Sequence, residues 1–254
     1  LSFEIASTNE ALAQVGFIVV AFNHRGGLPF RGKAYHTYGY SNIRDHALAD
    51  DKCGLEQLIA RHAFIDGNRV GVYGHSGGGM MSTAAICTYP DFYKACVSSA
   101  GNHDNNIYSQ FYVESHYAMN GPLPTNMELA KNLKGHLMLV VGCMDGNVHP
   151  AHTVRMADAF INHGKDVELV VLPRGRHTYD GVSSWYFERK LRSHFAKYLL
   201  GDFESSAFYD IEINELALLI GLALDNAIEA CEKVEENRYI YFEARNKKDY
   251  LVIH

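Results

Sequence analysis

The sequence lacks the features of a membrane protein or a nucleic-acid-binding protein. Its best candidate for a membrane span, residues 216–224, is about half as long as a helix that crosses a bilayer. Lysine and arginine number 23 against 29 aspartates and glutamates, and the formal net charge of −6 gives no reason to expect a nucleic acid. We therefore expect neither a membrane nor a nucleic acid among the partners of this chain.

Cysteine is also scarce. The 5 cysteines stand singly, no spacing among them or with histidine predicts a zinc site, and the odd count argues against a complete disulfide framework. We interpret Cys53, Cys87 and Cys96, which fall in predicted helices or strands, as small buried hydrophobic residues. Cys143 lies near the predicted active edge and at most lines a pocket. We expect no metal and no cofactor.

The composition is that of an ordinary globular protein, with 47% hydrophobic and 20% charged residues in 254. Apolar runs alternate with helical stretches, which predicts a mainly parallel sheet covered by helices on both faces. The predicted strands are residues 17–22, 69–73, 94–99, 136–141 and 166–172. The predicted helices are residues 8–16, 45–62, 79–88, 126–133, 150–163 and 183–200.

The most informative stretch is a glycine-rich turn between a predicted strand and a predicted helix, Gly74-His75-Ser76-Gly77-Gly78. A serine hydroxyl becomes an effective nucleophile when a sharp turn holds it exposed beside a base and near oxyanion donors. Glycines two positions before and two positions after the serine allow the crowded backbone to bend. Ser76 is therefore the predicted nucleophile. The alternative is a glycine turn that only caps the following helix.

An acid and a base follow in the order that an α/β-hydrolase requires. Asp145 comes just after the apolar strand 136–141, and His177 comes just after the strand 166–172. Open parallel sheets place their chemistry at the carboxyl ends of the strands, which is where both residues and Ser76 are expected. We predict that these three residues meet at one edge of the sheet.

Other histidines and one other acid fit these roles less well. His75 lies inside the turn and is expected to shape the pocket, whereas His194 is expected on a solvated face of the last helix. Asp180 is the rival acid, but it follows no strand. The remaining candidates lie at the two ends of one predicted helix: His149, His152 and His163.

Arg25, which follows the first predicted strand, allows two interpretations. It could bind an anion, or it could brace the loops through an ion pair with Asp45 or Asp51. We favour the structural ion pair, with the aromatic residues between Tyr35 and Tyr40 covering the loop.

Several separate stretches carry a resemblance to a known family. They are Gly16-Phe17-Ile18-Val19-Val20 leading to Asn23-His24-Arg25-Gly26-Gly27; Tyr38-Gly39-Tyr40 with Arg44-Asp45 and Ala49-Asp50-Asp51; the six residues from Gly74 to Gly79; Ser98-Ser99-Ala100-Gly101-Asn102-His103-Asp104; Asp145-Gly146-Asn147-Val148-His149-Pro150; and His177. Together they resemble the catalytic domain of the prolyl oligopeptidase family of serine peptidases, in its dipeptidyl-peptidase IV branch and especially its bacterial enzymes.

The resemblance implies an α/β-hydrolase domain over residues 1–206 that acts on peptide substrates. It implies Ser76 as nucleophile, His177 as base and Asp145 as the residue that orients the base. It also implies that the backbone N–H of Gly77 forms half of the oxyanion hole. Two further side chains would bind substrate: Asn147, at a substrate carbonyl, and Tyr108, in the specificity pocket.

The family also has parts that this sequence does not contain. The second oxyanion donor is a tyrosine upstream of the first helix, and a large upstream β-propeller holds the amino terminus of the substrate. We therefore expect an N-terminally truncated catalytic domain that is impaired as a peptidase, with any oligomer formed through the missing regions. The resemblance implies a periplasmic or secreted protein, although the sequence itself carries no signal peptide and leaves the compartment unknown.

The composition changes near residue 205. Residues 207–254 predict an α-β-β tail, with a helix over 214–233 and strands over 238–244 and 250–254. Its stretch from Leu222 to Cys231 resembles the N-box helix of GHKL-type ATPase domains of sensor histidine kinases. That resemblance implies a magnesium ligand at Asn226, with Glu229 one turn later.

Three hypotheses about function follow from the two resemblances. The first is a serine peptidase. The second is a nucleotide-binding signalling fragment of the histidine-kinase type, and the third is an inactive fusion product. Since the glycine-rich segment that holds adenine would follow His254, we expect no closed nucleotide pocket in the tail.

Overall fold

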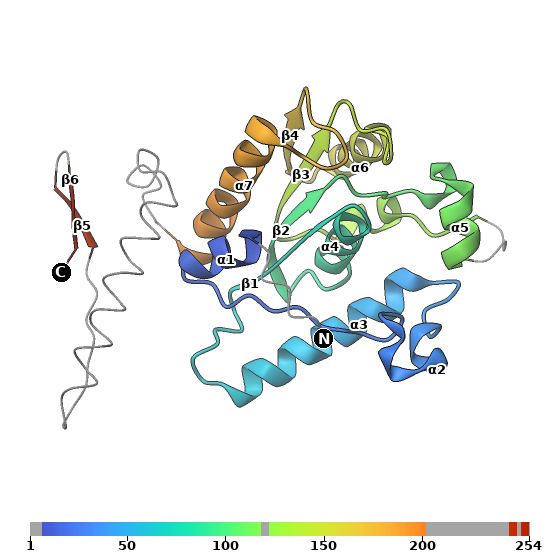
Figure 1. The fold of residues 1–254 in the computed structure, drawn as a ribbon, viewed down its shortest axis with the longest axis horizontal. Coiled ribbons are helices and arrows are strands. Elements are labelled where there is room, and N and C mark those ends of the chain that lie inside the picture. Colours follow the sequence, from blue (N-terminus) through green and yellow to red (C-terminus); the bar gives the residue numbers. More distant parts are fainter. Residues whose placement is uncertain (1–6, 118–121, 202–243, 248–249, 254) are drawn as a thin grey trace. The chain divides into compact units, whose positions relative to one another are not determined.

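The computed structural model describes residues 7–117, 122–201, 244–247 and 250–253 (Figure 1). The chain divides into two compact units, Leu1–Gly201 and Asp202–His254. A parallel sheet runs through the first unit, and a pair of antiparallel strands makes up the described part of the second.

The sheet has the strand order β1-β2-β3-β4. Its strands are β1 (Val70–His75), β2 (Tyr93–Ser99), β3 (His136–Gly142) and β4 (Glu168–Leu172). Each strand pairs in parallel with the next along the chain, so that Val97 lies opposite Met138 and Val140 lies opposite Val170. Parallel neighbours require a crossover between them, and helices supply it here. All four carboxyl ends therefore reach the same edge of the sheet.

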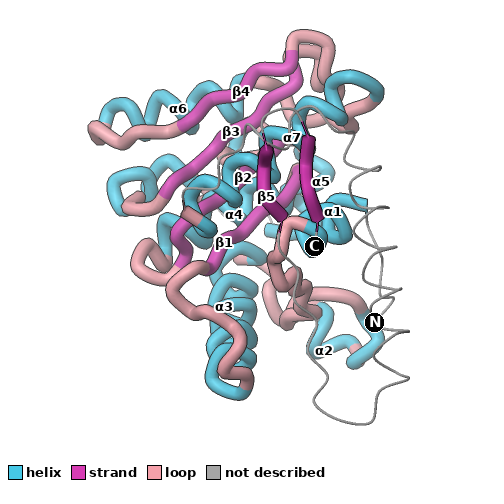
Figure 2. The backbone as a smooth tube through the Cα atoms, turned by 90° about the vertical axis from the view of Figure 1, so that its left-hand side faces the viewer, coloured by secondary structure: helices cyan, strands magenta, loops and turns pink. Residues whose placement is uncertain are grey.

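Helices cover both faces of this sheet (Figures 1 and 2). One face carries α3 (Ile43–Arg61), α4 (Gly77–Thr88) and α6 (Ala151–Asn162), and the other carries α1 (Ser7–Gln14) and α7 (Gly181–Phe195). A π-helical turn, Ala196–Leu200, continues α7. The predicted architecture, a mainly parallel sheet with helices on both faces, is confirmed.

Alternate side chains of the strands enter two separate cores. Along β3, Leu137 and Leu139 pack in the core that contains α3, α4 and α6, whereas Met138 and Val140 pack in the core that contains α1 and α7. Burying one large apolar side chain stabilises the fold by about 1.5–3 kcal/mol. The two cores therefore hold the strands from both sides and fix the ends from which the site is built.

The prediction of a fifth strand at residues 17–22 is wrong. The side chains alternate as in a strand: Phe17 and Val19 pack against the core of α1 and α7, while Ile18 and Val20 are exposed. No strand pairs with this segment in the described part of the chain. The sequence pattern reports which side chains are buried, whereas a strand also needs a neighbour for its backbone hydrogen bonds.

The shorter elements lie mostly in the connections. They are the 3-10 turns Pro29–Arg31, Asn105–Ile107 and Asn126–Asn132 and the helices α2 (Lys33–His36) and α5 (Gln110–Tyr117). A capping box starts the turn Asn126–Asn132: Thr125 and Glu128 satisfy each other's backbone N–H groups. This capping box fixes the start of the last turn before β3.

Arg25 forms the predicted kind of contact with a different partner. Its guanidinium and its backbone N–H donate to Asp50, with an Nη2–Oδ1 distance of 2.6 Å, and its guanidinium lies 4.0 Å from the centroid of the Tyr38 ring. The acids named from the sequence are bound elsewhere, Asp45 by Arg44 and Asp51 by His24. The prediction of Asp45 or Asp51 is wrong because consecutive acids on a helix point in different directions, and the sequence did not tell which one faces Arg25.

Two burial predictions are also wrong. His194 is buried rather than solvated, because α7 packs this face against the sheet, and its Nε2 lies 3.2 Å from the carbonyl oxygen of His136. Cys53 is exposed on α3, whereas Cys87 and Cys96 are buried as predicted. Burial raises the pKa of the Cys87 thiol to about 12, so this cysteine is an inert core residue.

The described part of the second unit consists of β5 (Ala244–Lys247) and β6 (Tyr250–Ile253), with Lys247 opposite Tyr250. Asn246 and Lys247 therefore belong to a strand, although the sequence placed them in the connection. The predicted helix over 214–233, with Asn226 and Glu229, lies outside the described residues. Among the residues that the structure does describe, no helix is long and apolar enough to cross a membrane.

Candidate active site

Ser76 stands at a sharp turn between β1 and α4. Its backbone angles, φ 59° and ψ −122°, are unusual for a residue other than glycine. Its N–H donates to the carbonyl oxygen of Ser99 at 2.8 Å, and its own carbonyl oxygen accepts from Met80 at 3.0 Å. These bonds to β2 and to the first turn of α4 hold the strained residue in place.

The turn needs one of the two glycines expected from the sequence, Gly74, together with Gly79. A Cβ on Gly74 would lie 2.3 Å from the carbonyl oxygen of Gly78, and one on Gly79 would lie 2.4 Å from that of Ser99. A Cβ on Gly78 would meet nothing within 4 Å. Gly74 and Gly79 are therefore required by close backbone approach, while Gly78 is not, although the sequence pattern singled it out.

The three side chains predicted to meet at the sheet edge do so. Ser76 Oγ lies 2.9 Å from Nε2 of His177, and Nδ1 of His177 lies 2.8 Å from Oδ2 of Asp145. They come from the loops that follow β1, β4 and β3, respectively. With Nδ1–H donating to the carboxylate, Nε2 is left to accept the hydroxyl proton of Ser76.

Asp145 is fixed on both oxygens. While Oδ2 accepts from His177, Oδ1 accepts from the backbone N–H groups of Asn147 and Val148 at 2.8 and 2.9 Å. Its side chain has no exposed surface, whereas 21% of the His177 side chain is exposed. Asp145 is thus buried, and the ring of His177 beside Ser76 is reachable from solvent.

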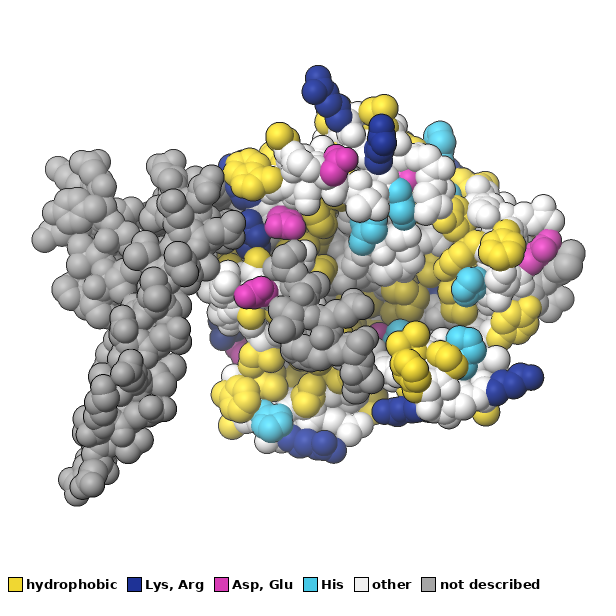
Figure 3. Space-filling view, viewed as in Figure 1, with side chains coloured by type: hydrophobic (Ala, Val, Ile, Leu, Met, Phe, Trp, Pro, Cys, Tyr) yellow, Lys and Arg dark blue, Asp and Glu magenta, His cyan; other side chains and the backbone are white. Residues whose placement is uncertain are grey.

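The other candidates do not occupy the positions of the acid and the base beside Ser76. Histidines are spread over the surface of the first unit (Figure 3), so position rather than abundance singles out His177. His152 is buried under Tyr108 and accepts from the backbone N–H of Asp104. Asp180 is the exposed residue before α7. His75 packs beside His177, with ring centroids 4.9 Å apart.

Tyr108 and Asn147 are joined to each other. The hydroxyl of Tyr108 donates to Oδ1 of Asn147 at 2.8 Å, which links the loop after β2 to the loop after β3. Burial raises the pKa of Tyr108, so its hydroxyl stays protonated at neutral pH. In this arrangement Oδ1 of Asn147 accepts and Nδ2 is left as a donor.

Tyr112 is the residue at this site that the sequence interpretation missed. Its ring packs edge to face on Tyr108, with centroids 5.1 Å apart, and its hydroxyl would lie 3.8 Å from a Cβ on Gly77. Burial raises its pKa. Tyr108 is extended and precedes α5, so the spacing of the two tyrosines in the sequence gave no signal of their contact.

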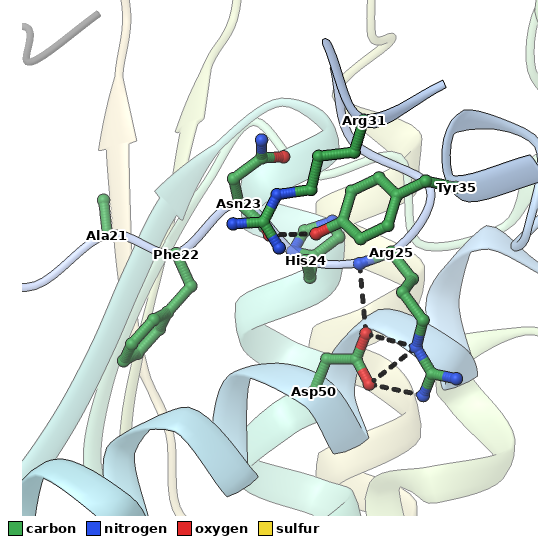
Figure 4. Close-up of a pocket in the computed structure, with 8 residues that line it drawn as sticks. All are labelled: Ala21, Phe22, Asn23, His24, Arg25, Arg31, Tyr35 and Asp50. Carbon is green, nitrogen blue, oxygen red and sulfur yellow. Dashed lines mark hydrogen bonds and ion pairs between the residues drawn. The ribbon is translucent and has the colours of Figure 1, made fainter. Parts of the chain in front are cut away.

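A separate hollow of about 410 Å³, which none of the side chains of Ser76, His177 and Asp145 lines, lies at the end of the segment 17–22 (Figure 4). It is lined by Ala21, Phe22, Asn23, His24, Arg25, Arg31, Tyr35 and Asp50. Of the described residues, no group of three or more histidines, cysteines or acids is placed to hold a metal ion.

Comparisons with known proteins match both units. Residues 3–204 match the prolyl oligopeptidase family, and residues 211–254 match the GHKL domain. Dipeptidyl peptidase 8 from Homo sapiens is 31% identical over 180 residues, which cover 66% of this chain and 20% of that protein. Prolyl endopeptidase FAP from Mus musculus is 24% identical over 200 residues, or 74% of this chain and 25% of that protein.

Solved structures give the same relationship. The chain superposes on a putative dipeptidyl aminopeptidase IV from Bacteroides ovatus with a TM-score of 0.64 and 25% identity, covering 69% of this chain and 26% of that one. Dipeptidyl peptidase 4 from Porphyromonas gingivalis, at 22% identity and a TM-score of 0.62 over 69% of this chain and 26% of that one, shares the fold.

The chain therefore spans about a fifth to a quarter of the length of these curated relatives. The span that matches contains the turn at Ser76 and both loops that carry Asp145 and His177. By this match, which covers most of its length, the chain belongs to the prolyl oligopeptidase family of serine peptidases, with an α/β-hydrolase fold.

Proposed function

We propose that the chain contains the catalytic centre of a serine peptidase that cleaves peptide bonds through an acyl-enzyme, with Ser76, His177 and Asp145 as its triad. The observation that carries the proposal is the unbroken chain of hydrogen bonds from Ser76 Oγ through His177 to Asp145, at 2.9 and 2.8 Å. Nucleophile, base and orienting acid in this arrangement are what acyl transfer requires.

In the first half of the reaction, Ser76 Oγ attacks the carbonyl carbon of the scissile peptide while Nε2 of His177 takes the hydroxyl proton. Asp145 holds the ring in the correct tautomer and stabilises the imidazolium that forms. The imidazolium then gives its proton to the leaving amine as the C–N bond breaks, which leaves an ester on Ser76. Water attacks that ester with the same base, and the serine is regenerated.

The backbone N–H of Gly77 is the donor that we assign to the oxyanion. Gly77 is the first residue of α4, and N–H groups in the first turn of a helix have no partner within the helix. The positive end of the helix dipole adds to this preference for negative charge. We assign Nδ2 of Asn147 to a substrate carbonyl, with Tyr108 holding the amide in that orientation.

Turnover by this chain alone is proposed to be slow. Losing one oxyanion donor typically lowers turnover by about 10²–10³-fold, and a peptidase of this kind is expected to use a second donor beside Gly77. The dipeptidyl peptidase and prolyl endopeptidase activities named for the relatives belong to proteins four to five times the length of the matched region. Specificity for amino-terminal dipeptides is therefore not assigned to this chain.

A serine-directed fluorophosphonate tests the proposal without requiring efficient turnover. We expect it to label the protein in the absence of metal or nucleotide, and Ser76→Ala to abolish the labelling. Ser115→Ala, at an exposed serine of α5, is the matched control and should label normally. Labelling that survives Ser76→Ala would refute the assignment.

The second unit supports a second candidate function, nucleotide binding, because residues 211–254 match the GHKL domain. Asn226 would ligate magnesium, with Glu229 nearby, since oxygen ligands suit this ion. This candidate predicts that ATP binds only in the presence of Mg²⁺ and that Asn226→Ala abolishes the binding. No binding in calorimetry at millimolar ATP would exclude it.

A further inference from the structure

His75 precedes Ser76 in the sequence and packs beside His177, yet the mechanism above gives it no role. It is the last residue of β1, and Ser99, the last residue of β2, lies directly opposite it in the sheet. Its ring packs on the imidazole of His177, with centroids 4.9 Å apart and an angle of 51° between the ring planes. A change in the ring of His75 would therefore first affect the position of the His177 ring.

A short chain of hydrogen bonds connects His75 to the loop that carries His177. Nδ1 of His75 lies 3.1 Å from Ser99 Oγ, and Ser99 Oγ lies 2.8 Å from the hydroxyl of Tyr179. Tyr179 follows His177 by two residues and packs edge to face on His75, with centroids 5.4 Å apart. The ends of β1 and β2 thus hold the base loop through side chains, in addition to the backbone connection.

One arrangement of protons satisfies every group in this network. Tyr179 donates to Ser99, Ser99 donates to Nδ1 of His75, and the remaining ring N–H of His75 donates to the backbone carbonyl of His177. In this arrangement His75 is neutral. A protonated His75 would have to donate to Ser99, which would leave one of the two hydroxyl protons, that of Ser99 or that of Tyr179, without an acceptor in this network.

The charges around His75 favour the same neutral form. Burial, followed by the neighbouring His177, lowers its pKa, while the hydrogen bond to the His177 backbone and the carboxylate of Asp145 act in the opposite direction. Tyr179 is uncharged, because burial raises its pKa to about 12. No second positive charge then stands beside the imidazolium that forms on His177 during the reaction.

We propose that His75, held by Ser99 and Tyr179, is a positioning residue that keeps the imidazole of His177 directed at Ser76. The proposal rests on the proposed function, since it needs His177 to be the base. His75 thus acts on the rate of proton transfer from Ser76 and has no part in binding the substrate.

Phosphonylation kinetics separate these effects, because the maximal inactivation rate, kinact, reports the reactivity of Ser76 and KI reports binding. His75→Phe retains a ring against His177 but loses Nδ1. We expect kinact to fall by about 10–100-fold, the cost of a small misplacement of a catalytic group, with KI unchanged. Ser99→Ala and Tyr179→Phe, which break the network from its other members, should lower kinact in the same way.

Ser98→Ala is the matched control. Ser98 is the preceding residue of β2, equally buried, but its hydroxyl donates to the carbonyl oxygen of Gly79 in α4 at 2.7 Å, away from His75. We expect its kinact to equal that of the wild type. Circular dichroism checks that each variant is folded. If His75→Phe does not fold, the two single variants Ser99→Ala and Tyr179→Phe decide the outcome.

A histidine titration followed by NMR provides the second readout. We expect His75 to titrate below the ordinary histidine pKa of about 6.5. Unchanged kinact in Ser99→Ala and Tyr179→Phe, a change confined to KI, or a His75 that titrates above the ordinary histidine pKa of about 6.5 would each overturn the proposal. A wild-type protein that the phosphonate does not label at Ser76 would instead overturn the proposed function, and this proposal with it.

Discussion

Two carboxylates, Asp145 and Asp50, make nearly the same contacts in very different surroundings. Each accepts from backbone N–H and from a basic side chain of a distant segment, His177 for Asp145 and Arg25 for Asp50. The distances are alike, 2.8 Å to His177 and 2.6 Å to Arg25. However, the Asp145 side chain is fully buried, whereas the side chains of Arg25 and Asp50 are 43% and 21% exposed.

The difference shows that a short ion-pair distance says little about what a pair does. Exposed pairs are screened by water and contribute little to stability, even when several hydrogen bonds are formed. The Asp145 carboxylate is buried, so water does not screen its contact with the ring of His177 beside Ser76. We therefore expect the pair at Asp145 to control reactivity and the pair at Asp50 to brace a surface loop.

The largest effect is expected from Asp145→Asn. The amide cannot accept the Nδ1 proton of His177 as the carboxylate does, so the ring takes the wrong tautomer and the rate of phosphonylation should fall by about 10³–10⁴-fold. Circular dichroism should show an intact fold. Asp180→Asn is the control and should react at the wild-type rate; a loss as large as that of Asp145→Asn would restore Asp180 as the rival acid.

A smaller effect, on stability, is expected at the turn that bears Ser76. Gly74→Ala places a Cβ 2.3 Å from the Gly78 carbonyl oxygen, so the turn must shift, and overpacking of this kind costs about 1–3 kcal/mol. Gly78→Ala is the matched control, since its Cβ meets nothing within 4 Å and alanine favours a helix by about 1 kcal/mol over glycine. Urea unfolding, followed by the fluorescence of Trp185, measures the free energy of unfolding of both variants. Equal destabilisation by Gly74→Ala and Gly78→Ala would contradict the geometry of the turn.

Asp50→Asn should destabilise less than Gly74→Ala. Arg25 lowers the pKa of Asp50, so the contribution of this pair is present above the unfolded pKa of about 4 and is lost as the pH falls through the lower folded value. Unfolding at pH 7 and pH 2 measures this contribution. The prediction would be contradicted if the free energies of unfolding of Asp50→Asn and the wild type differed more at pH 2 than at pH 7.

The smallest effect is expected from His24→Gln, with the opposite dependence on pH. A hydrogen bond to Asp51 raises the pKa of His24, so this contribution is present below the unfolded pKa of about 6.5 and is lost as the pH rises through the folded value. The wild type and the variant should differ most near pH 5 and converge at pH 9. Convergence at low pH instead would mean that the His24–Asp51 contact does not depend on the charge of the histidine.

The sequence predicted the parts of the site that depend on strand order. Ser76, Asp145 and His177 each follow an apolar strand, and parallel strands bring such positions to one edge whatever the details of packing. What it missed depends on packing in three dimensions. Which acid of α3 faces Arg25, which face of α7 buries His194, and whether residues 17–22 find a partner strand are set by distant parts of the chain.

The measurement that tests the account most directly is the location of the covalent adduct. After incubation with the fluorophosphonate, digestion and mass spectrometry should place the phosphonyl group on Ser76 in the wild-type protein. His177→Ala should carry none after the same time, because the serine then lacks its base. An adduct on any other residue, or equal modification of Ser76 in both proteins, would contradict the proposal that these side chains form a working catalytic centre.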